Sequence, residues 1–259
     1  MPERCRVAVL CVLAVLAALP SHAEELALPC SRDNTLFEDR EGNVSNGRGQ
    51  HLFVGKTLRG PIRRALLAFD LDAVPAGATI IEVRLSITVS QTQGGPQPLS
   101  LHRILSPWGE GASDANDPEG QGIEAEEDDA TWLHGFYPDS LWQLPGGDLS
   151  NEASAVLEVD GGGAYTWAST PELIGDVQRW LEKPEENFGW AVVGNEATPK
   201  TAKRFFSRQH EVEERRPVLH VRFEHGGATA VRAGSWGAIK GTAAGAPAIC
   251  RRPYHPPYQ

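Results

Sequence analysis

The sequence predicts an all-β protein built from two packed antiparallel sheets with one short helix. Apolar and polar residues alternate strictly from Ile81 to Val89, which is typical of a strand with one buried and one solvated face. Short apolar segments recur along the chain between glycine, proline, asparagine and aspartate, as in two-sheet β folds. Only the segment that follows Thr170 has apolar residues at helical spacing.

Eight segments have the length and pattern expected of strands, and proline or glycine separates most of them. They are residues 51–55, 64–70, 80–90, 99–105, 155–159, 188–193, 204–207 and 218–223. Residues 73–78 are predicted to be a turn between two strands, and Pro217 precedes the last strand. In contrast, residues 106–152 are rich in acidic residues, glycine and proline, and are predicted to form one long irregular loop.

The predicted helix has recognisable signals at both ends. Thr170 is a suitable N-cap, and Pro171 occupies the first helical position, where its missing N–H costs nothing. Pro184 ends the segment. Its apolar residues are Leu173, Ile174, Val177, Trp180 and Leu181. One short helix packed on a β fold is therefore expected.

The first 23 residues have the order of a secretory signal peptide: a basic start, an apolar run from Val7 to Leu19, and Ser21-His22-Ala23. A membrane anchor is the alternative, but this run is too short for about 30 Å of hydrocarbon. We expect a bacterial protein that is exported to the periplasm or secreted, without membrane insertion. Residues 24–225 would form the domain, and residues 226–259 a Gly/Ala/Pro-rich tail.

Charge and cysteine content narrow the possible partners. The formal net charge is −10, with no basic stretch to offset it, so binding to nucleic acid is not expected. Two cysteines, Cys30 and Cys250, lie outside the predicted signal peptide, near the two ends of the exported chain. We expect them to form a disulfide, because disulfides persist outside the cytoplasm. Two separate thiols, or pairing with another chain, remain alternatives.

Ten short motifs occur in an order that resembles the DNRLRE-domain family, which overlaps carbohydrate-binding module family ninety-six. The resemblance covers roughly Asp33 to Phe223 and implies a jelly-roll β-sandwich of secreted or surface proteins, some of which bind polysaccharide. The family usually has glutamate after the Ser207-Arg208 pair, where this chain has Gln209. The motifs include Asp33-Asn34, Asn46-Gly47, Arg64-Ala65, Trp108-Gly109-Glu110-Gly111, Asp129-Ala130-Thr131-Trp132, Pro145-Gly146-Gly147-Asp148, Asp176-Val177, Asn187-Phe188-Gly189-Trp190, Phe206-Ser207-Arg208 and Arg216-Pro217.

Three of the seven tryptophans, Trp108, Trp132 and Trp142, lie in the long loop, with His134 close by. Exposed tryptophan faces stack on sugar rings, so these residues are candidates for a glycan-binding surface. The alternative is that they pin the loop to the sheets. The remaining tryptophans of the domain, Trp167, Trp180 and Trp190, are expected in the core.

Arginines recur near the last two strands, where Arg204 and Arg208 are candidate ligand-binding residues and Arg216 follows. Guanidinium groups match carboxylates bidentately, so they could bind an acidic polysaccharide. They could equally pair with carboxylates of the domain itself.

Five carboxylates fall between Glu124 and Asp129, and millimolar extracellular calcium suits a weak site made of such oxygens. Asp129 is the best candidate, with Asp128 and Glu126 beside it; a solvated acidic loop is the alternative. Asp33 with Glu38 and Asp39 is a second possible calcium site.

We find no nucleophile elbow, zinc-binding His-Glu-x-x-His motif or phosphate-binding glycine loop. The sequence therefore favours a secreted, non-catalytic module that recognises polysaccharide or a cell-surface glycan through loop aromatics and arginines, with calcium as a possible cofactor. An extracellular structural or adhesion module is the main alternative. A stand-alone polysaccharide hydrolase or lyase is less favoured, and the oligomeric state is left open.

Overall fold

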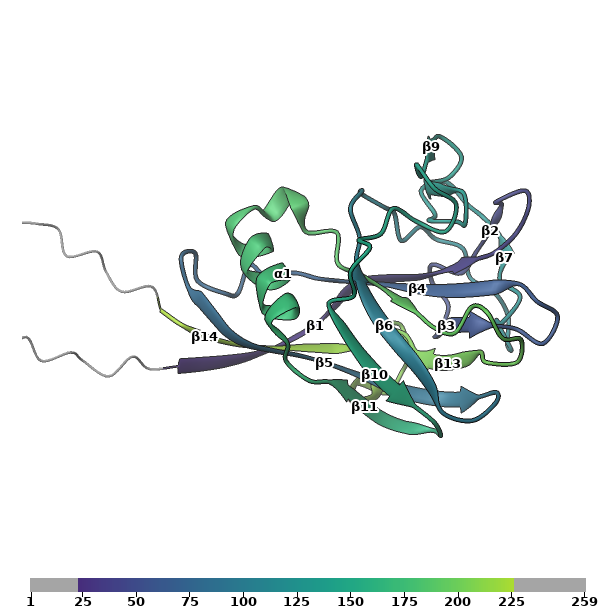
Figure 1. Cartoon of the computed structure of the whole chain (residues 1–259). Coiled ribbons are helices and arrows are strands. Elements are labelled where there is room, and N and C mark those ends of the chain that lie inside the picture. The colour runs from purple at the N-terminus through teal and green to yellow at the C-terminus, as the bar shows by residue number, and fades with distance from the viewer. Residues whose placement is uncertain (1–22, 226–259) are drawn as a thin grey trace, which may run out of the picture. The chain divides into compact units, whose positions relative to one another are not determined.

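The computed structural model describes residues 23–225, and its elements confirm the predicted all-β class. Strands dominate, and one α-helix and two short 3-10 helices accompany them in this part of the chain (Figure 1). The elements are β1 (Ala23–Phe37), β2 (Val44–Ser45), β3 (His51–Lys56), β4 (Ile62–Phe69), β5 (Thr79–Thr92), β6 (Gln97–Arg103), β7 (Ile123–Glu124), β8 (His134–Phe136), β9 (Ser140–Leu141), β10 (Ala155–Val159), β11 (Gly163–Trp167), α1 (Pro171–Glu182), η1 (Pro184–Glu186), β12 (Trp190–Val193), β13 (Lys203–Phe206), η2 (Glu213–Arg215) and β14 (Val218–Glu224).

Six strands close into a ring in the order β1, β14, β5, β13, β3, β4 and back to β1, with every neighbouring pair antiparallel. Strands β12, β6 and β10 continue the layer beyond β4, and β11 pairs with β5. The layer that contains β14, β5 and β13 and the layer that contains β4, β12 and β6 are therefore hydrogen-bonded into one continuous sheet. The jelly-roll arrangement implied by the family resemblance is not confirmed, because the strands close into a six-stranded barrel.

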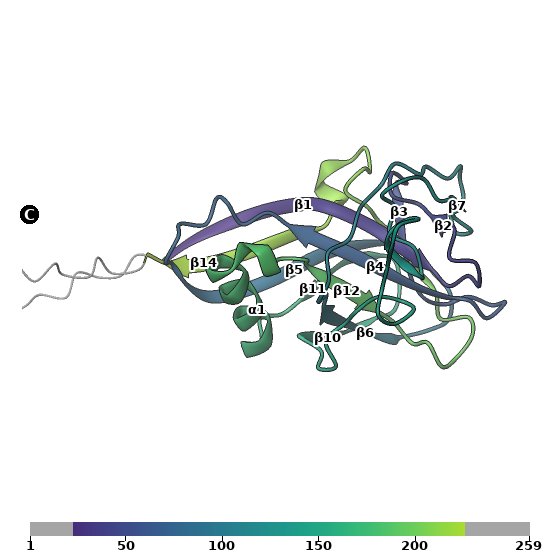
Figure 2. The same ribbon diagram turned by 90° about the horizontal axis from the view of Figure 1, so that it is seen from above.

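The long strand β1 joins the two layers, and Figure 2 shows it running across both. Its first half, Ala23 to Pro29, pairs with β14, and its second half, Cys30 to Phe37, pairs with β4. The register shifts between Cys30 and Arg32, where the strand passes from one layer to the other. The sequence analysis missed β1, since this shift and the polar residues Arg32 to Thr35 interrupt the alternation.

All eight predicted strands are present, with ends that agree within two residues. The alternation in β5 places Val83, Leu85, Ile87 and Val89 in the core, as expected of a strand with one buried face. Strand β11, which follows Gly161 and Gly162, was not predicted, and Trp167 within it is fully buried.

The predicted helix is also present, as α1. The backbone N–H of Leu173 donates to Oγ1 of the N-cap Thr170 at 3.0 Å, and Pro171 takes the first position. Its apolar face packs into the main core through Leu173, Val177 and Trp180, next to β5. No helix among residues 23–225 has the length and apolar character needed to cross a bilayer.

Strand β4 is buried on both faces, which explains its continuous apolar sequence. Leu67 and Phe69 face the main core, whereas Leu66 and Ala68 face a second hydrophobic cluster. The long loop of residues 106–152 supplies the other side of this second cluster. The loop residues of this cluster are Trp108, Ala130, Trp132 and Trp142, and Ile104 joins them from just before the loop. The fold thus has two cores, one inside the strand ring and one beneath the long loop.

Candidate functional site

Residues far apart in the sequence meet in a buried polar network that we call the polar anchor, centred on Asp33, Glu110 and Arg208. The Arg208 guanidinium donates to both carboxylate oxygens of Glu110. The Arg208 backbone N–H donates to Asp33 Oδ2 at 2.7 Å, and the Asp33 N–H donates to Glu110 Oε1 at 3.0 Å. The anchor ties the start of the long loop to β1 and to the segment after β13.

Burial has the largest effect on the pKa of the Asp33 carboxyl and raises it to about 8. The hydrogen bond from the Arg208 backbone and the Arg208 charge oppose this effect, while the negative charge of Glu110 adds to it. The Asp33 carboxyl is therefore largely protonated at neutral pH, which limits its repulsion of Glu110.

Asparagines continue the anchor along the long loop. Asn34 Nδ2 donates to Ser45 Oγ at 3.0 Å and to the Glu110 carbonyl at 2.9 Å. Asn46 Nδ2 donates to Glu119 Oε2 at 3.0 Å, and His51 Nδ1 lies 3.1 Å from Glu119 Oε1. Burial opposes ionisation of Glu119, but the hydrogen bonds from His51 and Asn46 outweigh it and lower the pKa of this carboxyl.

Gln209, the departure from the family pattern, fits the anchor through its amide. Its Nε2 donates to the Gly47 carbonyl at 3.0 Å and to Glu110 Oε1 at 3.2 Å. A glutamate at this position would place a second carboxylate against Glu110 with no amide hydrogen to donate. The same tight packing requires Gly111, since a Cβ there would lie 1.6 Å from Asp129 Oδ1.

The structure corrects the expected aromatic binding surface. Trp108 is fully buried and donates to the Phe188 carbonyl at 2.8 Å, and the buried Trp142 donates to the Thr131 carbonyl at 2.9 Å. Trp132 is 9% exposed, and the Arg64 guanidinium lies 5.0 Å from its ring centre. Trp108 and Trp142 are therefore covered and hold the loop on the sheet, as the alternative interpretation expects, whereas Trp132 keeps a small exposed part that lines a hollow with Glu38 and Asp39.

The other predicted loop residues have local roles. His134 Nδ1 lies 3.0 Å from Thr131 Oγ1 and 3.1 Å from the Gly42 carbonyl, which fixes its ring within the loop.

Asp129, the best calcium candidate, is fully buried, and its Oδ2 accepts the Glu126 backbone N–H at 2.7 Å. Burial raises the pKa of Asp129. Asp128 and Glu126 are exposed on the loop surface, and no cluster of three or more histidine, cysteine or acidic side chains with metal-binding geometry occurs within residues 23–225. Asp33 belongs to the anchor, whereas Glu38 and Asp39 line a separate hollow. Calcium binding stays a prediction.

Cys30 is buried at the layer change of β1, where burial raises the pKa of its thiol. Its predicted partner Cys250 lies outside the described residues, so the disulfide stays a prediction.

The structure brings Arg204 together with two arginines that the sequence analysis did not select. Arg59, Arg63 and Arg204 line a cleft of about 450 Å³, which we call the arginine cleft. It lies between the β3–β4 turn, the end of β5, the start of β13 and residues 118–121 of the long loop. The lining has no carboxylate, although the chain as a whole carries a net charge of −10.

Arg63 is 5% exposed and has no carboxylate within salt-bridge distance in the described part of the chain. Its two terminal nitrogens donate to the carbonyls of Ile62 at 2.9 Å and of Gly120 at 3.5 Å, and the guanidinium lies 4.7 Å from the ring centre of Phe37. Its Nε–H is buried and has no hydrogen-bond partner among residues 23–225. Burial lowers its pKa to about 10, so the group stays charged at neutral pH. An unpaired buried guanidinium is costly unless an anion completes it.

Arg204, on β13, also lines the cleft. Its Nε donates to Ser90 Oγ at 2.9 Å, which orients the guanidinium and leaves both terminal nitrogens without a partner in the described chain. Arg59 is exposed on the β3–β4 turn, and Gln91 and Gln93 add amide groups at the end of β5.

The consecutive pair Arg63-Arg64 was the sequence signal for this cleft. Neighbouring residues of a strand point to opposite faces, so one arginine of the pair had to point inward. Arg64 pairs bidentately with Glu196, at 2.7 and 2.9 Å, and Arg63 has no such partner among residues 23–225. Two other arginines that were noted in the sequence pair with carboxylates of the chain. Arg208 pairs with Glu110 in the polar anchor, and Arg216 Nη1 lies 3.5 Å from Glu213 Oε1.

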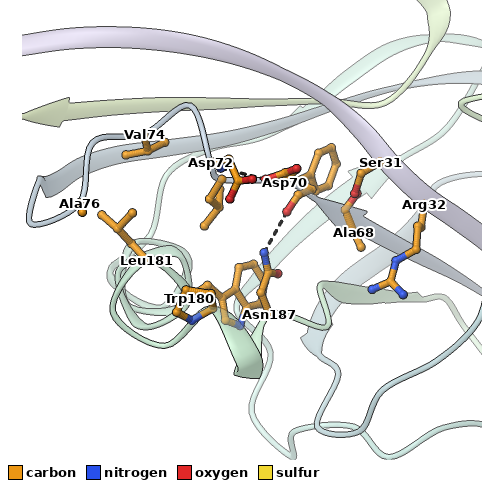
Figure 3. Close-up of a pocket in the computed structure, with 13 residues that line it drawn as sticks. Ser31, Arg32, Ala68, Asp70, Asp72, Val74, Ala76, Trp180, Leu181 and Asn187 are labelled. Atoms are coloured by element: carbon orange, nitrogen blue, oxygen red, sulfur yellow. Dashed lines mark hydrogen bonds between the residues drawn. The ribbon is translucent and has the colours of Figure 1, made fainter.

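A second hollow, of about 540 Å³, lies between α1 and the β4–β5 connection (Figure 3). Its lining includes the apolar Leu181 and Val74, Asp70 and Asp72 together at one side, and the single arginine Arg32. Asn187 Nδ2 donates to the Phe69 carbonyl at 2.9 Å at the other side. With two carboxylates and one arginine, this hollow suits an acidic ligand less well than the arginine cleft, which has three arginines and no carboxylate.

Comparison of the chain with protein-family models found no match, and comparison with curated proteins found none either.

Proposed function

We propose that this chain is an exported, non-catalytic binding module that recognises an acidic polysaccharide in the arginine cleft. The observation that carries the proposal is the buried, unpaired guanidinium of Arg63, which lines a cleft with two further arginines and no carboxylate. A carboxylate or sulfate group of a polysaccharide would supply the missing charge.

The lining groups match the chemistry of such a ligand. Guanidinium forks bind planar anions through paired, charge-assisted hydrogen bonds. The amides of Gln91, Gln93 and Gln121 both donate and accept, so they suit sugar hydroxyl groups. Phe53 adds an apolar surface at the base of the cleft. Recognition would therefore depend on arginines and amides, in place of the stacked tryptophans that the sequence suggested.

Binding without turnover is proposed because of the side chains that line the cleft. General acid–base cleavage of a glycosidic bond needs a carboxyl, histidine or tyrosine group beside the scissile oxygen. The lining residues are arginines, glutamines, proline, threonine and apolar residues, and arginine is too basic to act as a proton donor near neutral pH.

The family resemblance supports the same function. Asp33-Asn34, Glu110 and Arg208, which belong to motifs that carry the resemblance, are in contact in one anchor. Their shared role in holding the long loop accounts for the recurrence of these residue types together. We propose membership of the DNRLRE-domain family on this basis.

A glycan array that includes uronate-containing, sulfated and neutral polysaccharides tests the proposal, with one arm in EDTA. Acidic glycans should be retained and neutral ones should not, and no shortened products should form on long incubation. Binding that survives EDTA assigns recognition to the arginines, whereas binding lost in EDTA assigns it to calcium. Retention of neutral glycans alone, or of none, would contradict the proposal, and the latter would favour a structural or adhesion module.

A further inference from the structure

A third hollow, of about 470 Å³, shares Pro61 with the arginine cleft as a lining residue. We call it the acidic hollow, because it contains Glu38 and Asp39 together with Arg40. Trp132 and Leu133 of the long loop form its apolar side. Pro61, on the β3–β4 connection that carries Arg59, is therefore shared by a cleft with three arginines and a hollow with two carboxylates and one arginine.

The carboxylates of the acidic hollow are held in place and keep free acceptors. Glu38 Oε2 accepts the Ile62 N–H at 2.6 Å, and Asp39 Oδ2 accepts the N–H groups of Glu41 and Gly42 at 3.0 and 3.1 Å. The second oxygen of each carboxylate forms no hydrogen bond within residues 23–225. Fixed carboxylate oxygens beside an apolar surface suit the hydroxyl groups of an uncharged sugar.

Charged groups of the acidic hollow also interact electrostatically with Arg63 in the arginine cleft. The carboxylates of Glu38 and Asp39 act on Arg63 by Coulomb attraction, which partly offsets the lowering of its pKa by burial. A bound anion will experience the same Coulomb forces. The arginines of the cleft attract it, and Glu38 and Asp39 of the acidic hollow repel it. A chain of consecutive anionic sugars would therefore place a carboxylate against Glu38 and Asp39.

We propose that the arginine cleft and the acidic hollow are consecutive subsites for a polysaccharide in which anionic sugars alternate with uncharged ones. The anionic sugar occupies the arginine cleft, and the uncharged neighbour occupies the acidic hollow, which shares Pro61. This inference rests on the proposed function and adds a selection rule to it: homopolymers of uronate are disfavoured.

Calorimetric titration with two oligosaccharide probes of equal length tests the rule. Hyaluronan oligosaccharides alternate a uronate with an N-acetylated sugar, and oligogalacturonates carry a uronate at every position. The wild-type protein should bind the hyaluronan probe at least fivefold more tightly. The double variant Glu38→Gln/Asp39→Asn keeps acceptor oxygens for the backbone N–H groups but removes both charges. Its affinity for oligogalacturonate should rise at least fivefold, against twofold or less for hyaluronan.

The change in the ratio of the two affinities is the decisive quantity, since it is independent of how the probes differ in linkage. Glu213→Gln/Glu214→Gln, on the exposed η2, removes the same charge elsewhere and should leave the ratio unchanged. If the double variant melts below the wild type, Asp39→Asn alone should still shift the ratio at least twofold. A ratio unaffected by these variants overturns the inference while the proposed function stands. Absence of binding to both probes and to sulfated glycans overturns the proposed function itself.

Discussion

At the residue scale, a substitution of Arg63 distinguishes binding by positive charge alone from binding that also needs the planar geometry of a guanidinium group. Lysine at this position would keep the positive charge but lose the planar guanidinium fork. We expect Arg63→Lys to weaken binding of an acidic polysaccharide about tenfold, measured by calorimetric titration at fixed ionic strength. An affinity equal to that of the wild type would mean that the cleft acts only as a diffuse positive charge.

Asp33 gives a prediction for the pH dependence of stability. Its pKa in the folded protein, about 8, lies above the ordinary value of 3.8, so the folded state binds the proton more tightly than the unfolded state. Its contribution to stability is therefore complete below about pH 4 and is lost as the pH rises towards 8, by up to about 1.4 kcal/mol per pH unit.

Asparagine at position 33 can still accept the Arg208 N–H but does not titrate. Thermal unfolding between pH 4 and pH 9 should show the wild type losing stability relative to Asp33→Asn as the pH rises. Parallel melting curves for the two proteins across this range would contradict the burial assigned to Asp33.

At the element scale, the ion pair of Glu110 with Arg208 fastens the long loop. Glu110→Gln removes the carboxylate that receives both guanidinium donors, and we expect a loss of about 2 kcal/mol in the free energy of unfolding. Urea denaturation measures this loss, and limited proteolysis should cut residues 106–152 faster. Glu186→Gln, in an exposed pair with Lys183, is the control and should leave both measurements unchanged. Unaltered cleavage of the loop in Glu110→Gln would contradict the anchoring role.

The sequence predicted those elements whose pattern is local. Strict alternation identified β5, and the cap and prolines identified α1. Strand β1 escaped because it changes layers at Cys30, so the face that is buried changes within one strand. For a related reason, the sequence left open whether the tryptophans of the long loop contact a ligand or hold the loop on the sheet. Strand β4 has two apolar faces, and one of them needs a cover that only residues distant in sequence can supply.

At the scale of the whole molecule, closure of the strand ring determines which side chains share a site. The ring brings β4, β3, β13 and β5 together in that order, and with them Arg63 on β4, Arg204 on β13 and Gln91 on β5. These residues are separated by up to 141 positions, and no local pattern indicates that their strands are neighbours. The chemistry of the arginines could be anticipated from the sequence, but their grouping depended on long-range pairing.

The central claim, that an acidic polysaccharide binds in the arginine cleft, is tested most directly by calorimetric titration of Arg59→Ala/Arg204→Ala with such a glycan. A matched control, Arg84→Ala/Arg222→Ala, removes the same charge from residues that contact Glu82 outside the cleft. The account predicts at least a tenfold loss of affinity for the cleft variant and less than a threefold loss for the control. Equal affinities for the two variants would contradict it.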